Sequence, residues 1–275
     1  MNIERMMPMS MFHSGLNPKY LEAIKRFRLI DDTFFNICFN DSPECMQLLL
    51  SIIFDRTDII VREVVTQRSA HNLYGRGVRF DVLAVDGDGK IYNVEIQRDS
   101  DGANPKRARF NTCLIDSREV AKSTKYQDFP EVWVIFITEN DLFDARLPMY
   151  HVERVITELG RPFEDATHIA YVNGAYRAED PIGLLMHDFF CEDPTQMHYK
   201  VLAKRADFFK HETRGVNAMC EIMQELMKSE REEWLNEERT STAMEMLRDN
   251  EPMDKIIKYS RLSQQRIDEL SKQLN

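Results

Sequence analysis

The sequence is poor in the residues that mark repetitive, disordered or disulfide-bonded proteins. It has 10 Gly and 10 Pro among 275 residues, so long disordered or repeat regions are not expected. Its five cysteines are an odd number without a C-x-x-C pair, which predicts reduced, buried thiols in a cytoplasmic protein. No run approaches the ~18 apolar residues of a membrane span, and the Met-rich start lacks the apolar core of a signal peptide.

Positive charge is also scarce. The net charge is −10, whereas proteins that hold nucleic acid through bulk charge are usually basic. Contact with phosphates would therefore need a local basic patch or metal ions. The chain has no G-x-S-x-G, P-loop or Gly-rich dinucleotide motif, which argues against the enzyme classes that depend on them.

What is present indicates an α/β protein. Apolar residues make up 43% of the chain, enough for a sizeable core. The run EVWVIFIT (131–138) is nearly all apolar, as in a strand covered on both faces of an α/β sheet. Further strands are expected at 59–67, twice within 77–97, and at 168–174; helices are expected at 42–54, at 104–123 and over most of the chain after 181.

The two strands within 77–97 carry acidic residues on one face. The period of two places Asp81 on one face of the first strand, and Glu95 with Gln97 on one face of the second. If 87–89 is a three-residue loop with a G1 bulge, Asp81 lies opposite Glu95, with Cβ atoms ~4.5–5.5 Å apart. A hard cation such as Mg²⁺ would relieve the repulsion between them. A two-residue loop would instead pair Asp81 with Val94, and carboxylates on a half-exposed strand usually face solvent.

A second group of metal-binding residue types occurs in HDFFCEDPTQMH (187–198). His187, Cys191 and His198 lie close together in the sequence, but two short-range donors of a zinc site are missing. A structural or surface role is favoured for them.

The order of strand, Asp, turn, strand, Glu-x-Gln and basic helix resembles the PD-(D/E)XK nuclease superfamily. More narrowly it resembles the recombination-promoting nuclease and transposase branch, in which Gln commonly replaces the Lys of the wider superfamily. The resemblance extends over about residues 29–275, and the tail KYSRLSQQRIDEL is similar to a short helical element of relatives. The other stretches that carry it are LIDDTFFNICFND (29–41), VTQRSAHNLYGRGVRFDVLAVD (65–86), YNVEIQRDSDGANPKRARF (92–110), FPEVWVIFITENDLF (129–143), LPMYHVERVI (147–156) and THIAYVNG (167–174).

The resemblance implies a restriction-endonuclease-like core, a central mixed sheet flanked by helices, followed by a helical C-terminal region. It implies that Asp81 and Glu95 are metal ligands for Mg²⁺, with Mn²⁺ as an alternative. Gln97 can orient water but brings no positive charge, which leaves the neutralisation of the transition state open. A further acid is expected from the first helices: Asp32 matches the family's opening Asp and is preferred over Glu44.

Three basic residues follow the second acidic strand. Lys106, Arg107 and Arg109 are candidates for contact with DNA phosphate, and positions 106 and 109 share a helix face. The alternative is an ordinary exposed helix face.

These observations predict a metal-dependent DNA endonuclease linked to recombination or mobile elements. The alternative is a catalytically weak or inactive nuclease-fold module that binds DNA or protein, and residues 181–275 are also open to a role in assembly. DNA is the expected partner, no membrane is expected, and a homo-oligomer is left open. The expected division is an N-terminal arm and first helix (1–28), a nuclease-like core (29–180), a helical extension (181–239), and a linker with a short helical element (240–275).

Overall fold

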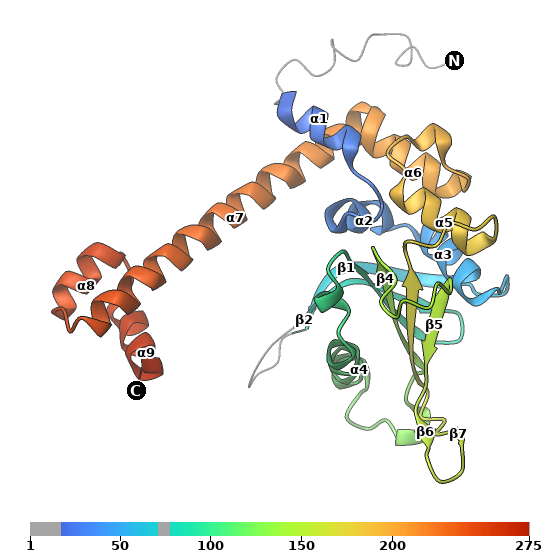
Figure 1. Ribbon diagram of the computed structural model, residues 1–275, viewed down its shortest axis with the longest axis horizontal. Coiled ribbons are helices and arrows are strands. Elements are labelled where there is room, and N and C mark those ends of the chain that lie inside the picture. Colours follow the sequence, from blue (N-terminus) through green and yellow to red (C-terminus); the bar gives the residue numbers. More distant parts are fainter. Residues whose placement is uncertain (1–17, 71–77, 275) are drawn as a thin grey trace. The chain divides into compact units, whose positions relative to one another are not determined.

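The computed structural model describes residues 18–70 and 78–274 (Figure 1). The chain divides into two compact units, one reaching to Val216 and the other beginning at Asn217. The predicted N-terminal arm lies outside the described residues, up to the start of helix α1 (Pro18–Arg26).

The first unit is built around a mixed six-stranded sheet in the order β1-β2-β3-β4-β8-β5. The β1, β2 and β3 strands are antiparallel, β3, β4 and β8 are parallel, and β5 returns antiparallel at the edge. The strands are β1 (Val61–Ala70), β2 (Val78–Asp86), β3 (Ile91–Gln97), β4 (Val132–Thr138), β5 (Met149–Val152) and β8 (Thr167–Asn173), with a small separate hairpin of β6 (Val155–Ile156) and β7 (Arg161–Pro162). The sequence predicted a mixed sheet flanked by helices and followed by a helical region, and this is confirmed.

Helices cover both faces of the sheet. Helix α4 (Pro105–Glu119) packs on one face, and Figure 1 shows α2 (Asp32–Phe39) and α3 (Pro43–Phe54) on the other. Six of the seven residues of β4 are buried, because parallel strands in the middle of a sheet are covered on both sides. Because helices cover both faces, the sheet is accessible to other molecules mainly at the ends of its strands.

Helix α4 begins where the sequence predicts it. The Asn104 side chain accepts a hydrogen bond from the Lys106 N–H at 2.9 Å, and Pro105 occupies the first helical position. Leu114 and Ile115 of this helix pack on Leu83 and Ile91, which lie on the same sheet face as Asp81 and Glu95. Helix α4 therefore covers the face that carries the acidic residues.

Two predictions from the sequence are wrong in part. The thiol of Cys113 is exposed on the outer face of α4 and Cys191 is half-buried, although none of the five cysteines forms a disulfide. A linker was expected at the beginning of segment 240–275, but helix α7 (Thr213–Arg248) continues through residues 240–248. The reason is apolar packing: Ala243 is fully buried in a core with the two last helices.

The C-terminal part of the chain is helical throughout. Helices α5 (Pro181–Phe190) and α6 (Lys200–His211) belong to the first unit, and α8 (Met253–Ser260) and α9 (Gln264–Leu274) to the second. Within the described ranges, none of the helices combines the length and the apolar composition needed to cross a membrane.

The end of β8 depends on a glycine. The Gly174 N–H donates to the Thr138 carbonyl at 2.8 Å, and a Cβ on Gly174 would lie 2.0 Å from that oxygen. We expect Gly174→Ala to lower the free energy of unfolding by about 2–3 kcal/mol, because neither backbone can give way. This corresponds to a fall in Tm of roughly 4–12 °C in a thermal melt.

Gly87, in the turn between β2 and β3, supplies a control for this substitution. A Cβ on Gly87 would come no closer than 3.6 Å to another atom, so Gly87→Ala should change Tm by less than about 2 °C. Equal Tm values for the two variants would show that the end of β8 can relax.

Candidate active site

The hairpin between β2 and β3 has the longer of the two loops considered from the sequence. Gly89 adopts a positive φ of 82°, and the Asp86 N–H donates to the Lys90 carbonyl at 3.1 Å. The strand register pairs Val82 with Val94, so the next positions outward, Asp81 and Glu95, face each other. The three-residue loop is confirmed, and the pairing of Asp81 with Val94 is excluded.

The backbone ladder between the strands ends beside the two acidic residues. The Ile96 N–H donates to Asp81 Oδ2 at 2.9 Å, and the Asp81 N–H reaches Glu95 Oε1 at 3.4 Å. The carboxylates thus take the N–H groups that the ladder leaves without partners. The Oδ1 oxygen of Asp81 receives no hydrogen bond from the residues that the structure describes.

Glu95 is fully buried and surrounded by donors. Asn93 Nδ2 donates to Glu95 Oε1 at 2.9 Å, and the Asn93 amide oxygen accepts from Asn111 Nδ2 of α4, also at 2.9 Å. The Arg107 guanidinium, again from α4, forms an ion pair with Glu95 Oε2. One helix therefore fixes the orientation of this carboxylate from two positions.

Gln97 lies within reach of the same guanidinium. Arg107 Nη1 donates to Gln97 Oε1 at 3.1 Å and to the Gly102 carbonyl at 3.3 Å. A Cβ on Gly102 would lie 1.9 Å from Gln97 Oε1, so only glycine leaves room for the amide in this position. Glu95, Gln97 and Arg107 form one hydrogen-bonded group.

The structure brings Asp32, and not Glu44, into the electrostatic surroundings of Asp81. Asp32 opens α2, and its charge contributes to the shift in the Asp81 pKa, whereas Glu44 is exposed on α3. Arg98, directly after β3, forms an ion pair with Asp31 at 3.2 Å and so ties the start of α2 to the end of β3.

Burial disfavours the ionised form of both Asp81 and Glu95. Burial, with the charges of Glu95 and Asp32, raises the pKa of Asp81 to about 8. Burial also raises the pKa of Glu95, against the opposing effects of Arg107 and Asn93. The site therefore has a deficit of positive charge even with Arg107 in place.

A hollow of about 720 Å³ opens beside this group, and it is basic. Lys106 and Arg109 line it from the exposed side of α4, Arg79 lines it from β2, and Arg107 joins it to Glu95 and Gln97. The three residues proposed from the sequence for phosphate contact thus all border one space, although Arg107 also binds the acidic group.

A family model for PD-(D/E)XK nuclease family transposases matches residues 39–176. The match spans about half of the chain and includes every strand of the sheet with Asp81, Glu95 and Gln97. The chain belongs to this family. The mixed sheet flanked by helices is consistent with its restriction-endonuclease-like fold. No curated protein and no solved structure matches the chain.

The PD-(D/E)XK nucleases generally use divalent metals, and the residues present here fit such an ion. Asp81 offers Oδ1, which no described residue engages, next to the Glu95 carboxylate and near Asp32. Carboxylate oxygens are the ligands that Mg²⁺ and Mn²⁺ prefer. The raised pKa values of both carboxyl groups are what such an ion would reverse.

Sequence reasoning missed two amides of this transposase-family site. Asn93 and Asn111 are fully buried polar residues, and they connect α4 to Glu95. A signal for Asn93 existed, because it shares a strand face with Glu95 and Gln97. Nothing in the sequence connects Asn111 to that strand, since the contact depends on how α4 packs.

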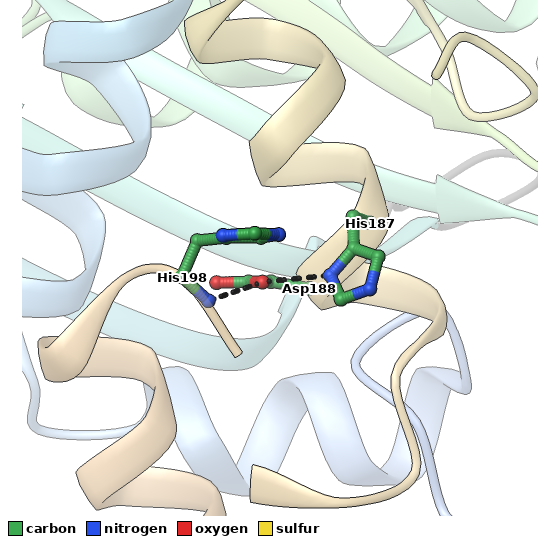
Figure 2. A group of neighbouring side chains, drawn as sticks. All are labelled: His187, Asp188 and His198. Carbon is green, nitrogen blue, oxygen red and sulfur yellow. Dashed lines mark hydrogen bonds and ion pairs between the residues drawn. The ribbon is translucent and has the colours of Figure 1, made fainter. Parts of the chain in front are cut away.

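The histidine cluster lies apart in the chain, at the end of α5 (Figure 2). Single ligand atoms of His187, Asp188 and His198 lie within 4.8 Å of one another. The Asp188 carboxylate accepts the backbone N–H groups of His198 and Tyr199, each at 2.8 Å, and so anchors the segment before α6. Cys191 is not part of the group. The structural or surface role favoured from the sequence stays a prediction.

Proposed function

We propose that this chain is a metal-dependent endonuclease that hydrolyses phosphodiester bonds of DNA during recombination or the movement of mobile elements. The observation that carries the proposal is the opposition of Asp81 and Glu95 at the point where the β2–β3 ladder ends. Asp81 and Glu95 would hold Mg²⁺ or Mn²⁺. The ion would supply Lewis acidity for water activation and charge neutralisation at the phosphate.

We assign the remaining residues of the proposed site their roles from the groups that they contact. Asp32 adds a third carboxylate close to Asp81. The Gln97 amide, held by Arg107, orients water. Arg107 supplies next to Gln97 the positive charge that glutamine lacks. Lys106 and Arg109 bind DNA phosphates at the rim of the hollow.

One contact favours a second candidate function. The Arg107 guanidinium already neutralises Glu95, as expected in a nuclease fold that binds DNA or protein without cutting. The opposed Asp81 carboxylate, with a raised pKa and an oxygen that no described residue engages, has no purpose in such a module. We therefore place the endonuclease first.

The test is nicking of supercoiled plasmid by the full chain, with Mg²⁺ or Mn²⁺ against EDTA, beside Glu95→Gln. Cutting that requires metal and is lost in the variant supports the endonuclease. Cutting that survives Glu95→Gln would come from a contaminant or another site. Absence of cutting by the wild type, together with absence of metal binding in calorimetry, supports the binding module.

The same assay distinguishes the two candidate third acids. We expect Asp32→Asn to lower the cleavage rate by roughly 10- to 100-fold, because it removes a carboxylate close to Asp81. Glu44→Gln is the matched control, since Glu44 is an exposed first-turn acid of the neighbouring helix, and it should cut at the wild-type rate. Equal rates for both variants would remove Asp32 from the site.

A further inference from the structure

The second unit contains a compact group of helices that the candidate active site does not use. The end of α7 packs with α8 and α9 (Figure 1). The residues that meet in this core are Ala243, Ile256, Ile267 and Leu270, surrounded by Met244, Met246, Leu247, Met253, Ile257 and Leu262. This small core holds the last two helices against the end of α7.

The connection between α8 and α9 is a tight turn of three residues. Helix α8 has eight residues and ends at Ser260, Arg261 adopts a left-handed conformation with φ 58° and ψ 21°, and α9 begins at Gln264. The Ile267 N–H donates to the Ser263 carbonyl at 3.1 Å and starts the new helix. A turn of three or four residues, with a left-handed position that often carries Gly, is the connection found between the two helices of a helix-turn-helix.

The burial pattern separates an inner from an outer face in both helices. Ile256 and Ser260 are buried four residues apart in α8, and Ile267 and Leu270 three residues apart in α9. The Ser260 hydroxyl lies inside the turn, where it donates to the Ile256 carbonyl at 2.7 Å. The remaining positions at the start of α9 are exposed.

The exposed start of α9 carries side chains of the types that form hydrogen bonds with base edges in DNA-binding proteins. Gln264, Gln265 and Arg266 are exposed in its first turn, and Arg266 forms an ion pair with Glu269 at 2.9 Å on the helix surface. In helix-turn-helix proteins the first residues of the second helix contact bases in the major groove. Gln can pair with adenine and Arg with guanine in a bidentate manner.

The charge of this segment is opposite to that of the chain. Residues 253–275 contain five Lys and Arg against three Asp and Glu, whereas the whole chain has a net charge of −10. Lys258 and Arg261 are exposed beside the turn, next to the start of α9. Positive charge flanking a reading helix is what contact with the DNA backbone requires.

We propose that α8 and α9, supported by the end of α7, form a helix-turn-helix that binds duplex DNA with α9 in the major groove. Gln264, Gln265 and Arg266 contact base edges, and Lys258 and Arg261 contact phosphates. The module binds DNA without metal, so it does not depend on the proposed nuclease activity. A transposase-family nuclease with such a module has a means of holding duplex DNA that its acidic net charge would otherwise oppose.

The experiment is fluorescence anisotropy with a labelled duplex of mixed sequence, about three helical turns long. The full chain carries Glu95→Gln and the buffer contains EDTA, so the duplex stays intact and no metal bridges it to Asp81. Lys258→Gln, Arg261→Asn and Arg266→Gln together should weaken duplex binding at least ~10-fold in about 50 mM salt. The Asn at 261 keeps the left-handed position acceptable, which protects the turn.

The matched control removes the same charge from α7 in this unit, at the exposed residues Lys228 and Arg231 and the half-buried Arg239. Lys228→Gln, Arg231→Gln and Arg239→Gln change positions outside the apolar core that α7 forms with α8 and α9, and together they should weaken binding less than about 3-fold. Equal losses in the two triple variants, or no duplex binding by the parent chain, would overturn the proposal. A helix-turn-helix variant that keeps its duplex affinity but changes its mass in light scattering would overturn it as well, because the surface would then bind protein.

A second variant tests base reading separately from charge. Gln264→Ala and Gln265→Ala leave the charge unchanged, and both side chains are exposed, so Tm should stay within about 2 °C of the parent. Selection from a pool of randomised duplexes should then yield a different preferred sequence from that of the parent. An unchanged preference would contradict the placement of α9 in the major groove.

Discussion

Asp81→Asn is expected to abolish metal-dependent cleavage while making the metal-free protein more stable above neutral pH. The cleavage rate should fall by roughly three orders of magnitude, because the substitution removes a charged ligand but keeps an acceptor for the Ile96 N–H. The fold is retained, so the loss is chemical and not structural. Plasmid nicking measures the loss of cleavage, and calorimetry with Mn²⁺ measures the loss of metal binding that accompanies the removal of the ligand.

The gain in stability follows from the raised pKa of Asp81. Because its folded pKa of about 8 exceeds the ordinary 3.8, the carboxyl favours folding most below about pH 4. That contribution is lost progressively as the pH rises from about 4 to about 8, because the unfolded chain releases a proton that the folded protein still holds; the loss is complete once the folded carboxyl also ionises, beside Glu95 and Asp32. The Asp81→Asn variant does not lose stability in this way, because asparagine does not ionise.

The measurement is Tm against pH for both proteins in EDTA. We expect Asp81→Asn to exceed the wild type by on the order of 2 kcal/mol at pH 8–9, roughly 4–8 °C in Tm, with a difference that shrinks steadily as the pH is lowered toward about 4. Excess Mg²⁺ should raise the wild-type Tm and leave the variant unchanged. A difference in Tm that stays constant across pH would show that Asp81 does not ionise against its neighbours.

Arg107→Met is expected to lower cleavage by roughly 100-fold at saturating metal. The guanidinium is the group that brings positive charge to Gln97 and Glu95, and a fixed charge at a developing anion has about this effect. The variant should also lose stability, because Glu95 is fully buried and would keep only its neutral donors. Rates are therefore compared below the Tm of both proteins.

Three further variants separate the effect of the Arg107 charge from the effect of its packing; the third is a control at another position of the same helix. Arg107→Lys keeps the charge but not the forked geometry and should recover part of the rate. Glu95→Gln combined with Arg107→Met should regain much of the stability lost in Arg107→Met, since no unpaired buried charge remains. Arg109→Met on the exposed side of the same helix should leave Tm unchanged. If Arg107→Met cut at the wild-type rate, Arg107 would be only a counter-ion for the metal-free state.

The local pattern of the sequence was sufficient for much of the sheet and for two acids of the site. Alternation with period two, together with Gly89 at the bulge position, predicts that Asp81 faces Glu95, and the register of β2 and β3 agrees. The apolar run of β4 and the Asn104–Pro105 start of α4 are equally local signals. Such features depend on neighbouring residues and on the backbone geometry that they permit.

The tertiary structure decided which side chains join those acids. Asn111 and Arg107 reach Glu95 only because α4 packs its Leu114 and Ile115 onto the acidic face of the sheet. It likewise decided that residues 240–248 are helix and not linker, since Ala243 is buried against α8 and α9. The sequence by itself determined most of the strands of the sheet and, for a three-residue loop, the opposition of Asp81 and Glu95, because these follow from local spacing. The tertiary structure decided between the two possible loops, and the packing of segments distant in sequence determined the charge around the carboxylates.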